Sequence, residues 1–357
     1  MTTELMRCPE DGITSVMFSP SEPSLLLVSS WDSKVRLYDV DMNIVKGMQT
    51  HAAPILDCCF VGSSGRCLSG GLGRDLRLYD FQKEADTLVG KHAEAVRQVR
   101  WNGDTGLLFS GSWDGTVAAW DARSQSLSHR VSLDTKVFAM ALSEGAYAKL
   151  VVGDASKKVH VYDLRKLDQP EQVRSDLVKY QIRCLAPFAD GNGFAVGTTE
   201  GRVAYEYFQP GVHAPNNNIP VTTNATPDTT TGYSFKCHRA KMQYEDIVSY
   251  SHLGATVETD KIFSVNAIAF NQKYNTFATG GGDGSVAIWD GLKKKRLWRL
   301  SKPLPTAVTA LAFNADSTKL AVAVSHDFSQ PLAEPRLGTF AQIIVKEVAP
   351  EDIKRRT

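Results

Sequence analysis

The sequence has almost no net charge and lacks long apolar runs. Its 357 residues include 40 Lys and Arg against 39 Asp and Glu, which leaves a formal charge of +1. A chain with this balance is not a general polyanion binder, so we expect no direct contact with nucleic acid. No apolar run reaches about 18 residues, and the N-terminal segment MTTELMRCPEDG has no apolar signal-peptide core. We therefore expect no signal peptide and no membrane span.

Motifs for metal binding and catalysis are also missing. The six cysteines form no CxxC pair with metal-site spacing, and several lie in apolar runs, which predicts free thiols in a reducing, intracellular compartment. The eight histidines form no HExxH motif, and the sequence has no GxGxxG, GxxxxGK[ST] or GxSxG motif. Such motifs bind zinc, cradle phosphates or position a nucleophile. We therefore expect no enzyme activity, no cofactor and no metal site.

A short pattern does recur along the chain at nearly constant spacing. Six segments align on the apolar residue that follows a turn: Val35, Leu76, Val117, Val159, Val203 and Val286. The steps between them are 41, 41, 42, 44 and 83 residues. Short β-branched or aromatic runs surround each anchor and are separated by Gly, Asp, Asn and Ser, as in strands joined by turns. A period just above 40 residues predicts an all-β fold, the WD-repeat β-propeller.

The number of blades follows from the last repeats. A seventh, degenerate copy lies in AVTALAFNADSTKLAVAVS and TFAQIIVKEV. The 83-residue step contains residues 209–231, which are rich in Asn, Thr and Pro and are typical of a loop. We predict a single seven-bladed β-propeller over residues 1–348, with this insertion in blade five and a charged tail at 349–357. The first residues are expected to add the outer strand of the last blade and close the ring.

Blade three, with the stretch GSWDGTVAAWDAR, shows the repeat in full. We interpret His92, Asp114 and Trp120 as a buried hydrogen-bonded network within this blade and not as a catalytic site. Blade two has Gly73 at the position of Asp114, and blade five has Glu206-Tyr207 where other blades have Trp-Asp or Tyr-Asp. Those two blades must hold their turns by other contacts.

Two tryptophans are not required by the repeat. Trp31 and Trp113 each precede the Asp of the turn between the second and third strands, where other blades have Leu, Ala, Thr or Gly. Alternating strand direction places these turns on one face, which we call the top face. Tryptophan is a common anchor of binding hot spots. The two indoles are therefore predicted to bind a partner, although packing against a neighbouring blade is the alternative.

Four cationic residues of blade five are predicted to lie near the top face. Arg183 aligns with Thr14, Leu56, Arg97 and Asn266 at the first inward position below the rim. Arg202 follows the TEGRV turn, and GYSFKCHR should return antiparallel to it, which brings Lys236 and Arg239 close. Convergent Arg and Lys favour a phosphate or several carboxylates, so an acidic or phosphorylated peptide is the expected ligand. The alternative is a set of solvated cations, because Lys34 and Lys158 occupy the Arg202 position in other blades.

Several stretches resemble one family of propellers. EDGITSVMFSP, LLVSSWDSKVRLYDV, KYQIRC, EGRVAYEYF, FKCHR and FATGGGDGSVAIWD resemble the spindle-assembly-checkpoint propeller of the budding-uninhibited-by-benzimidazole group, over residues 10 to about 325. The messenger-RNA export propeller of the nuclear pore is a close relative that shares FKCHR and a version of EGRVA. An export adaptor that binds a nucleoporin peptide is therefore the alternative function.

The resemblance implies a non-catalytic adaptor of the nucleus and, in mitosis, of the kinetochore. In this family the top face binds GLEBS-type peptides of a checkpoint kinase and its kinase-like relative. A phosphothreonine in Met-Glu-Leu-Thr repeats of a kinetochore scaffold docks on the side of the same face. The matching positions for the phosphate are Arg202 and Lys236, with Arg239 beside them, although the export relative also has this arginine.

The same resemblance assigns the rest of the peptide-binding surface. Its matching positions on the top face are Trp31, Trp113, Arg183 and Tyr180. Two insertions, 209–231 and 240–261, border the expected phosphate site. The loop SHDFSQPLAEPR at 325–336 has no expected role.

Overall fold

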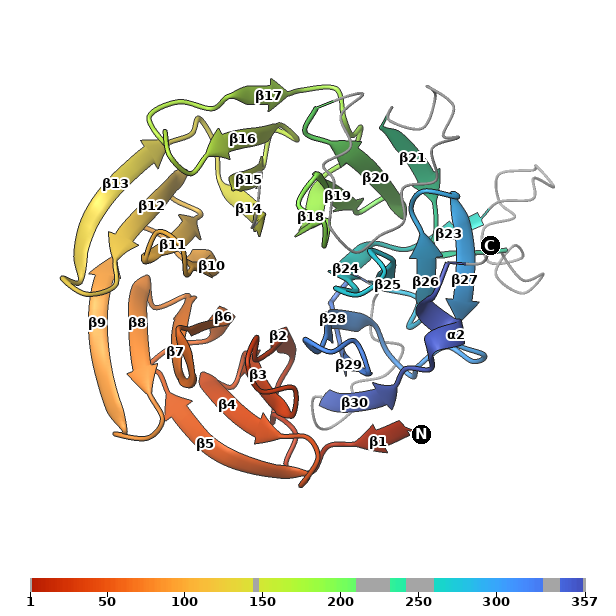
Figure 1. Ribbon diagram of the computed structural model, residues 1–357, viewed down its shortest axis with the longest axis horizontal. Helices are drawn as coiled ribbons and strands as arrows, with labels where there is room; N and C mark the ends of the chain where they lie inside the picture. The colour runs from red at the N-terminus through yellow and green to blue at the C-terminus, as the bar shows by residue number, and fades with distance from the viewer. Residues whose placement is uncertain (1, 144–147, 210–231, 242–259, 330–340, 356–357) are drawn as a thin grey trace, which may run out of the picture.

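Seven four-stranded antiparallel sheets stand around a central axis (Figure 1). This computed structural model describes residues 2–143, 148–209, 232–241, 260–329 and 341–355. Each sheet is one blade, with its first strand innermost, and the arrangement confirms the predicted all-β, seven-bladed WD-repeat propeller. Between blades five and six lies a further two-stranded sheet, β22 (Arg239–Lys241) with β23 (Asp260–Ile262).

The strands of the first four blades follow one another in sequence order. They are β2 (Ile13–Phe18), β3 (Leu25–Ser30), β4 (Lys34–Asp39) and β5 (Ile44–Thr50) in blade one; β6 (Ile55–Val61), β7 (Ser63–Gly71), β8 (Asp75–Asp80) and β9 (Ala85–Lys91) in blade two; β10 (Val96–Asn102), β11 (Leu107–Ser112), β12 (Thr116–Asp121) and β13 (Ser126–Ser132) in blade three; and β14 (Val137–Ser143), β15 (Lys149–Asp154), β16 (Val159–Asp163) and β17 (Gln172–Arg174) in blade four.

The last three blades complete the ring. They contain β18 (Ile182–Pro187), β19 (Gly193–Thr198), β20 (Arg202–Tyr207) and β21 (Tyr233–Lys236) in blade five; β24 (Val265–Phe270), β25 (Phe277–Gly281), β26 (Val286–Asp290) and β27 (Lys295–Arg299) in blade six; and β28 (Val308–Phe313), β29 (Lys319–Ser325), β30 (Ala341–Glu347) and β1 (Thr2–Glu4) in blade seven.

The two ends of the propeller meet in blade seven. Strand β1 pairs antiparallel with β30, with Thr2 opposite Lys346 and Glu4 opposite Ile344. This confirms the expectation that the first residues supply the outer strand of the last blade. Because the N-terminal strand completes a sheet built from the C-terminal part of the chain, the ring is closed by backbone hydrogen bonds and by side-chain packing together.

All seven inner strands carry an irregularity near their first residue. The register shifts between residues 13 and 15, 55 and 57, 96 and 98, 137 and 139, 182 and 184, 265 and 267, and 308 and 310. A bulge leaves one residue unpaired and bends the strand. Arg183 is the unpaired residue of blade five, at the same level as Thr14, Arg97 and Asn266, as the sequence alignment predicted.

Apolar side chains pack between neighbouring blades and form the core. Between blades two and three, for example, Leu68, Leu76, Val96 and Val99 are fully buried, and Trp120 is 5% exposed. Burying a side chain of this size contributes about 1.5–3 kcal/mol. Because each sheet packs against two neighbours, every blade depends on the closure of the ring.

A polar network crosses the core of blade three, as predicted. His92 Nδ1 lies 3.0 Å from Asp114 Oδ2, His92 Nε2 lies 2.7 Å from Ser110 Oγ, and Trp120 Nε1 donates to Ser110 Oγ at 2.8 Å. Burial raises the pKa of Asp114, but bonds from Thr116 and the Ala93 N–H outweigh it and hold the pKa at about 2. The Asp114 carboxylate is therefore charged at neutral pH and stabilises the blade through its hydrogen bonds.

Blade two contains only half of this network. His51 Nε2 lies 3.0 Å from Ser69 Oγ, but Gly73 offers no carboxylate to the other ring nitrogen. A cavity of about 230 Å³, lined by His51, Gly73 and Asp75 among others, remains at this place. Burial lowers the pKa of His51 to about 4, so the imidazole is neutral at physiological pH.

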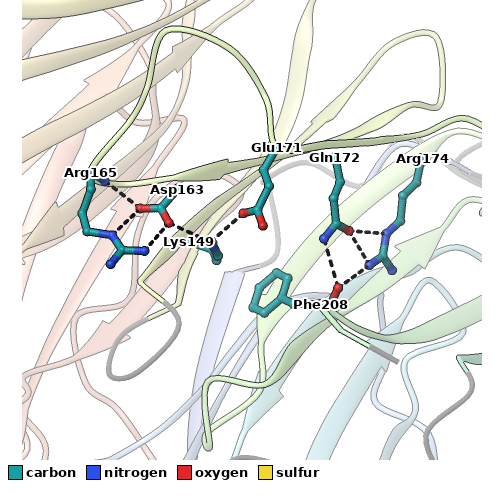
Figure 2. A network of polar contacts seen from close by, with 7 residues as sticks. All are labelled: Lys149, Asp163, Arg165, Glu171, Gln172, Arg174 and Phe208. Carbon is teal, nitrogen blue, oxygen red and sulfur yellow. Dashed lines mark hydrogen bonds and ion pairs between the residues drawn. The ribbon is translucent and has the colours of Figure 1, made fainter. Parts of the chain in front are cut away.

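Blade five replaces its missing Asp by contacts from blade four (Figure 2). Arg174 Nη2 donates to the Tyr207 carbonyl oxygen at 2.7 Å, and Gln172 Nε2 donates to the Phe208 carbonyl oxygen at 3.0 Å. Arg174 Nη1 also pairs with Glu206 Oε2 at 3.0 Å. These bonds fix the end of β20 at the point where the predicted insertion begins. Residues 210–231 of that insertion lie outside the described residues.

Packing continues past residue 348. The short helix α2 (Pro350–Ile353) lies beside β26 and β27, and Ile353 is only 3% exposed. Its carbonyl oxygen accepts a hydrogen bond from Thr276 Oγ1 at 2.9 Å. The segment 349–357 was expected as a charged tail. Its helix α2 instead buries Ile353 against blade six. Of the segments 240–261 and 325–336, residues 242–259 and 330–336 lie outside the described residues.

The described residues contain no helix with the length and apolar character needed to cross a membrane.

Candidate peptide-binding face and anion site

Arg202 and Lys236 occupy facing positions on the two outer strands of blade five. Arg202 is the first residue of β20, Lys236 is the last of β21, and they are Cα partners in the antiparallel ladder. Directly opposed residues point to the same face of a sheet, with Cβ atoms about 5 Å apart. The expected antiparallel return of GYSFKCHR is therefore confirmed for Tyr233–Lys236, and two cationic side chains share one surface. Arg239 does not continue this strand but begins β22, which pairs with β23.

The turn before β20 adds a carboxylate to this surface. Glu200 Oε1 lies 3.5 Å from Arg202 Nε and 3.7 Å from Arg239 Nη2. Gly201 follows it with φ +66°, and a Cβ there would lie 2.7 Å from the carbonyl oxygens of Cys237 and Phe263. Only glycine fits this close approach without displacing the backbone. Glu200 is not among the site residues predicted from the sequence, although it stands two residues before Arg202 in the TEGRV turn.

Arg239 is the most enclosed of the cationic residues. Its side chain is 16% exposed, and Nη2 donates to the Glu200 carbonyl oxygen at 3.2 Å. Its Nε is buried and has no hydrogen-bond partner. The residue before it, His238, is held by Asp283 at 2.8 Å and Thr279 at 3.0 Å. A rigid element therefore presents Arg239, and one of its donors remains unused.

Arg183 lies on β18, the innermost strand of blade five. Its Nε donates to Asn266 Oδ1 of blade six at 3.2 Å, and Asn266 Nδ2 donates to Asp327 Oδ2 at 2.8 Å. Burial raises the pKa of Asp327, but bonds from Ser329 and Asn266 outweigh it and lower the pKa. Arg202, Lys236 and Arg239 thus gather around the Glu200 turn, whereas Arg183 lies beside the central channel with an exposed side chain.

The three aromatic residues of the predicted peptide surface differ in exposure. Trp31 is 38% exposed and Tyr180 is 51% exposed. Trp113 is half-buried, its Nε1 is buried without a partner, and Lys136 Nζ stands 5.8 Å from the ring centroid. Trp31 and Tyr180 are therefore available to a partner. Trp113 contacts Lys136, which precedes β14 of blade four, as expected if its indole packs against the next blade.

Two further cations lie beside this site, on β27 of blade six. Arg296 and Arg299 line a cavity of about 170 Å³ together with Lys236, Cys237 and Arg239. The run Lys293–Arg296, expected as a solvated loop, thus enters a strand. A bulge at Leu297 of β27 places Arg296 opposite Trp289 and Arg299 opposite Ala287, so both arginines share a face. Periodicity alone would have assigned them to opposite faces.

The described residues contain no cluster of three or more His, Cys, Asp or Glu side chains placed to hold a metal ion. The charged groups around the Glu200 turn are the cations Arg202, Lys236 and Arg239 with one carboxylate between the two arginines. Such an arrangement binds anions through charge-assisted hydrogen bonds.

Known proteins share this architecture and much of the sequence. The model of the "WD domain, G-beta repeat" family matches residues 2–39, 83–121 and 256–290. Among solved structures, that of U3-55K superimposes with a TM-score of 0.76 at 16% identity, covering 97% of this chain and 98% of that one. This likeness supports the fold alone.

Whole-chain sequence relatives are closer. "Mitotic checkpoint protein bub3" of Dictyostelium discoideum is 38% identical over 92% of this chain and 89% of its own length. "Mitotic checkpoint protein BUB3.1" of Arabidopsis thaliana is 40% identical over 92% of this chain and 88% of its own length. A "Poly(A)+ RNA export protein" of Schizosaccharomyces pombe is 31% identical, covering 99% and 92%. With this identity over nearly the whole propeller, the chain belongs to the bub3 family of mitotic checkpoint WD-repeat proteins.

Proposed function

We propose that this protein is a mitotic checkpoint adaptor that binds phosphorylated Met-Glu-Leu-Thr repeats of a kinetochore scaffold. It also binds GLEBS-type peptides of a checkpoint kinase and its kinase-like relative, and so recruits them to kinetochores. It acts as a binding scaffold without catalysis, in the nucleus and at mitotic kinetochores. The names of the relatives, mitotic checkpoint proteins, support this role.

The observation that carries the phosphate part is the pairing of Arg202 with Lys236. Two cations held on facing positions of rigid strands converge on a single anion at little entropic cost. Arg239 extends the site from the next element along the chain. A phosphothreonine brings about −1.5 to −2 charges and three acceptor oxygens, which matches a site with three cationic side chains.

The second peptide is assigned to the top face around the channel. Trp31 and Tyr180 supply exposed aromatic anchors, and Arg183 supplies a guanidinium beside the channel. Aromatic and Arg side chains dominate the energetics of most interfaces. An acidic peptide with apolar positions therefore fits this face. Trp113 completes the proposed surface from blade three.

The test is a titration of a phosphorylated repeat peptide and its unphosphorylated twin. We expect clear preference for the phosphorylated form in the unaltered protein and its loss in the double variant Arg202→Ala/Lys236→Ala. Lys34→Ala is the matched control, because Lys34 holds the turn position of Arg202 in distant blade one. Equal affinities for the two peptides would refute the proposal.

A second candidate function rests on the RNA export relative, which is 31% identical and covers 99% of this chain. An export adaptor would bind a nucleoporin tail and locate at the nuclear rim in interphase. Affinity purification from mitotically arrested cells, with a phosphatase-treated control, distinguishes the two. Phosphatase-sensitive recovery of a kinetochore scaffold supports the checkpoint role, and phosphatase-insensitive recovery of a nucleoporin alone supports export.

A further inference from the structure

Glu200 lies between the two arginines of the anion site. One oxygen, Oε1, is 3.5 Å from Arg202 Nε and 3.7 Å from Arg239 Nη2. Its side chain is 20% exposed although it stands in a surface turn. Among the described residues, no other carboxylate forms an ion pair with either guanidinium. The proposed phosphate site thus contains its own anion.

These contacts are longer than those of the arginine–carboxylate pairs that are also hydrogen-bonded. Arg36 reaches Asp32 at 2.6 Å, Arg77 reaches Asp86 at 2.8 Å, and Arg174 reaches Glu206 at 3.0 Å. Charge-assisted N–H···O bonds normally measure about 2.7–2.9 Å. The pairs with Glu200 exceed this length, and the buried Nε of Arg239 has no partner. The carboxylate therefore neutralises part of the site without using up its donors.

We propose that Glu200 is an internal competitor of the phosphate: it lowers the affinity of the anion site for phosphopeptide. The inference rests on the proposed function and deepens it. A bound phosphate takes the donors of Arg202 and Arg239 while the Glu200 carboxylate repels it. This repulsion makes the binding free energy less favourable. The complex therefore dissociates more readily, and dephosphorylation can reverse it.

The charge of the ligand determines how strongly this competition acts. Coulomb repulsion from a fixed carboxylate scales with ligand charge, so a dianionic phosphate is penalised about twice as much as a monoanionic carboxylate. Removing the negative charge should therefore strengthen phosphopeptide binding more than binding of a peptide with Glu in place of phosphothreonine. A purely structural role predicts the opposite sign, because loss of the Glu200 contacts would loosen both arginines and weaken binding.

The experiment compares Glu200→Gln with the unaltered protein. Glutamine keeps the shape of the side chain and an acceptor oxygen for the arginines but removes the charge. At low salt we expect phosphopeptide affinity to rise about tenfold and the Glu-substituted peptide to gain about threefold. Glu22→Gln is the matched control, since this exposed residue lies in the loop between β2 and β3 on the opposite face. It changes net charge equally and should leave both affinities unchanged.

Two further measurements separate failure of this inference from failure of the proposed function. If the unaltered protein does not prefer the phosphopeptide, the proposed function fails. The role of Glu200 is then tested by titrating the protein with inorganic phosphate and with acetate, monitored at the Arg239 Nε–H signal by NMR. There too, Glu200→Gln should strengthen phosphate binding more than acetate binding. Unchanged or weaker binding in the variant, or equal gains for dianion and monoanion, would overturn the role of Glu200.

Discussion

Lys236 lies directly across the β20–β21 ladder from Arg202, and Glu200 stands beside that arginine. Two cations are thereby fixed on one face of blade five by the backbone register itself. The position of each is set by the strand that carries it. Disturbing either strand should therefore change anion binding, whereas changes in distant blades should leave anion binding unchanged.

The shared hydroxyl of blade three is a sensitive point of the fold. Ser110→Ala removes the partner of both His92 Nε2 and Trp120 Nε1, which then stay buried without hydrogen bonds. We expect a loss of about 1–3 kcal/mol in the free energy of unfolding. Urea denaturation measures it, with exposed Ser126→Ala as the control. An effect no larger than that of the control would contradict this account of the network.

Blade two offers the reverse experiment. Gly73 lacks positive φ, and a Cβ there would meet only Ala53 at 3.6 Å, so a side chain fits. Gly73→Asp should supply the missing carboxylate to His51 and stabilise the fold by about 1 kcal/mol. The gain should appear as a higher denaturation midpoint, beyond that of Gly73→Ala, which changes the backbone entropy alone. Equal midpoints for the two variants would show that no new bond forms.

The seam between blades four and five should respond to pH. Burial raises the pKa of Glu206, and Arg174 lowers it in part. In Arg174→Ala the carboxylate stays buried without its partner, so we expect about 2 kcal/mol of destabilisation at neutral pH. A raised folded pKa means that the folded state binds extra protons, so stability recovers as pH falls through that pKa.

Denaturation of this variant between pH 7 and pH 5 measures the effect. Arg174→Lys is the control, because it keeps the charge and loses the bonds that Arg174 Nη2 donates to the Tyr207 and Phe208 carbonyl oxygens. A deficit of Arg174→Ala that stays constant over this pH range would show that Glu206 does not account for it.

The two top-face tryptophans should separate in their effects. Trp31→Ala should weaken binding of a GLEBS-type peptide by about 2 kcal/mol, as at a hot spot, with little change in stability. Trp113 is half-buried beneath Lys136, so Trp113→Ala should cost more stability and less affinity. Peptide titration and urea denaturation of both variants provide the comparison. Equal losses of affinity would mean that the indoles act alike.

The fold could be predicted from the sequence because the repeat itself encodes it. Each anchor, such as Val117 with Trp120-Asp121, specifies one strand and its turn, and the spacing of the anchors gives the ring. The antiparallel pairing of Arg202 with Lys236 followed from strand alternation alone. Both features depend on the order of short segments along the chain and not on contacts between distant ones.

Other features depend on contacts between distant segments. The bond from Arg174 to the Tyr207 carbonyl joins two blades, and no pattern within either blade indicates it. The bulge in β27 places Arg296 and Arg299 on the same face of the sheet, whereas a strict period of two predicts opposite faces. The proximity of Glu200 to two arginines also has no local sequence signal, because acidic residues in turns are common.

The central claim is that Arg202 and Lys236 hold one common phosphate. A double-mutant cycle on phosphopeptide affinity tests it most directly, with Arg202→Ala, Lys236→Ala and the double variant. If both side chains contact the same anion, the losses should be non-additive, with a coupling energy of about 1 kcal/mol or more. Strict additivity of the two losses, or no loss in either single variant, would contradict the account.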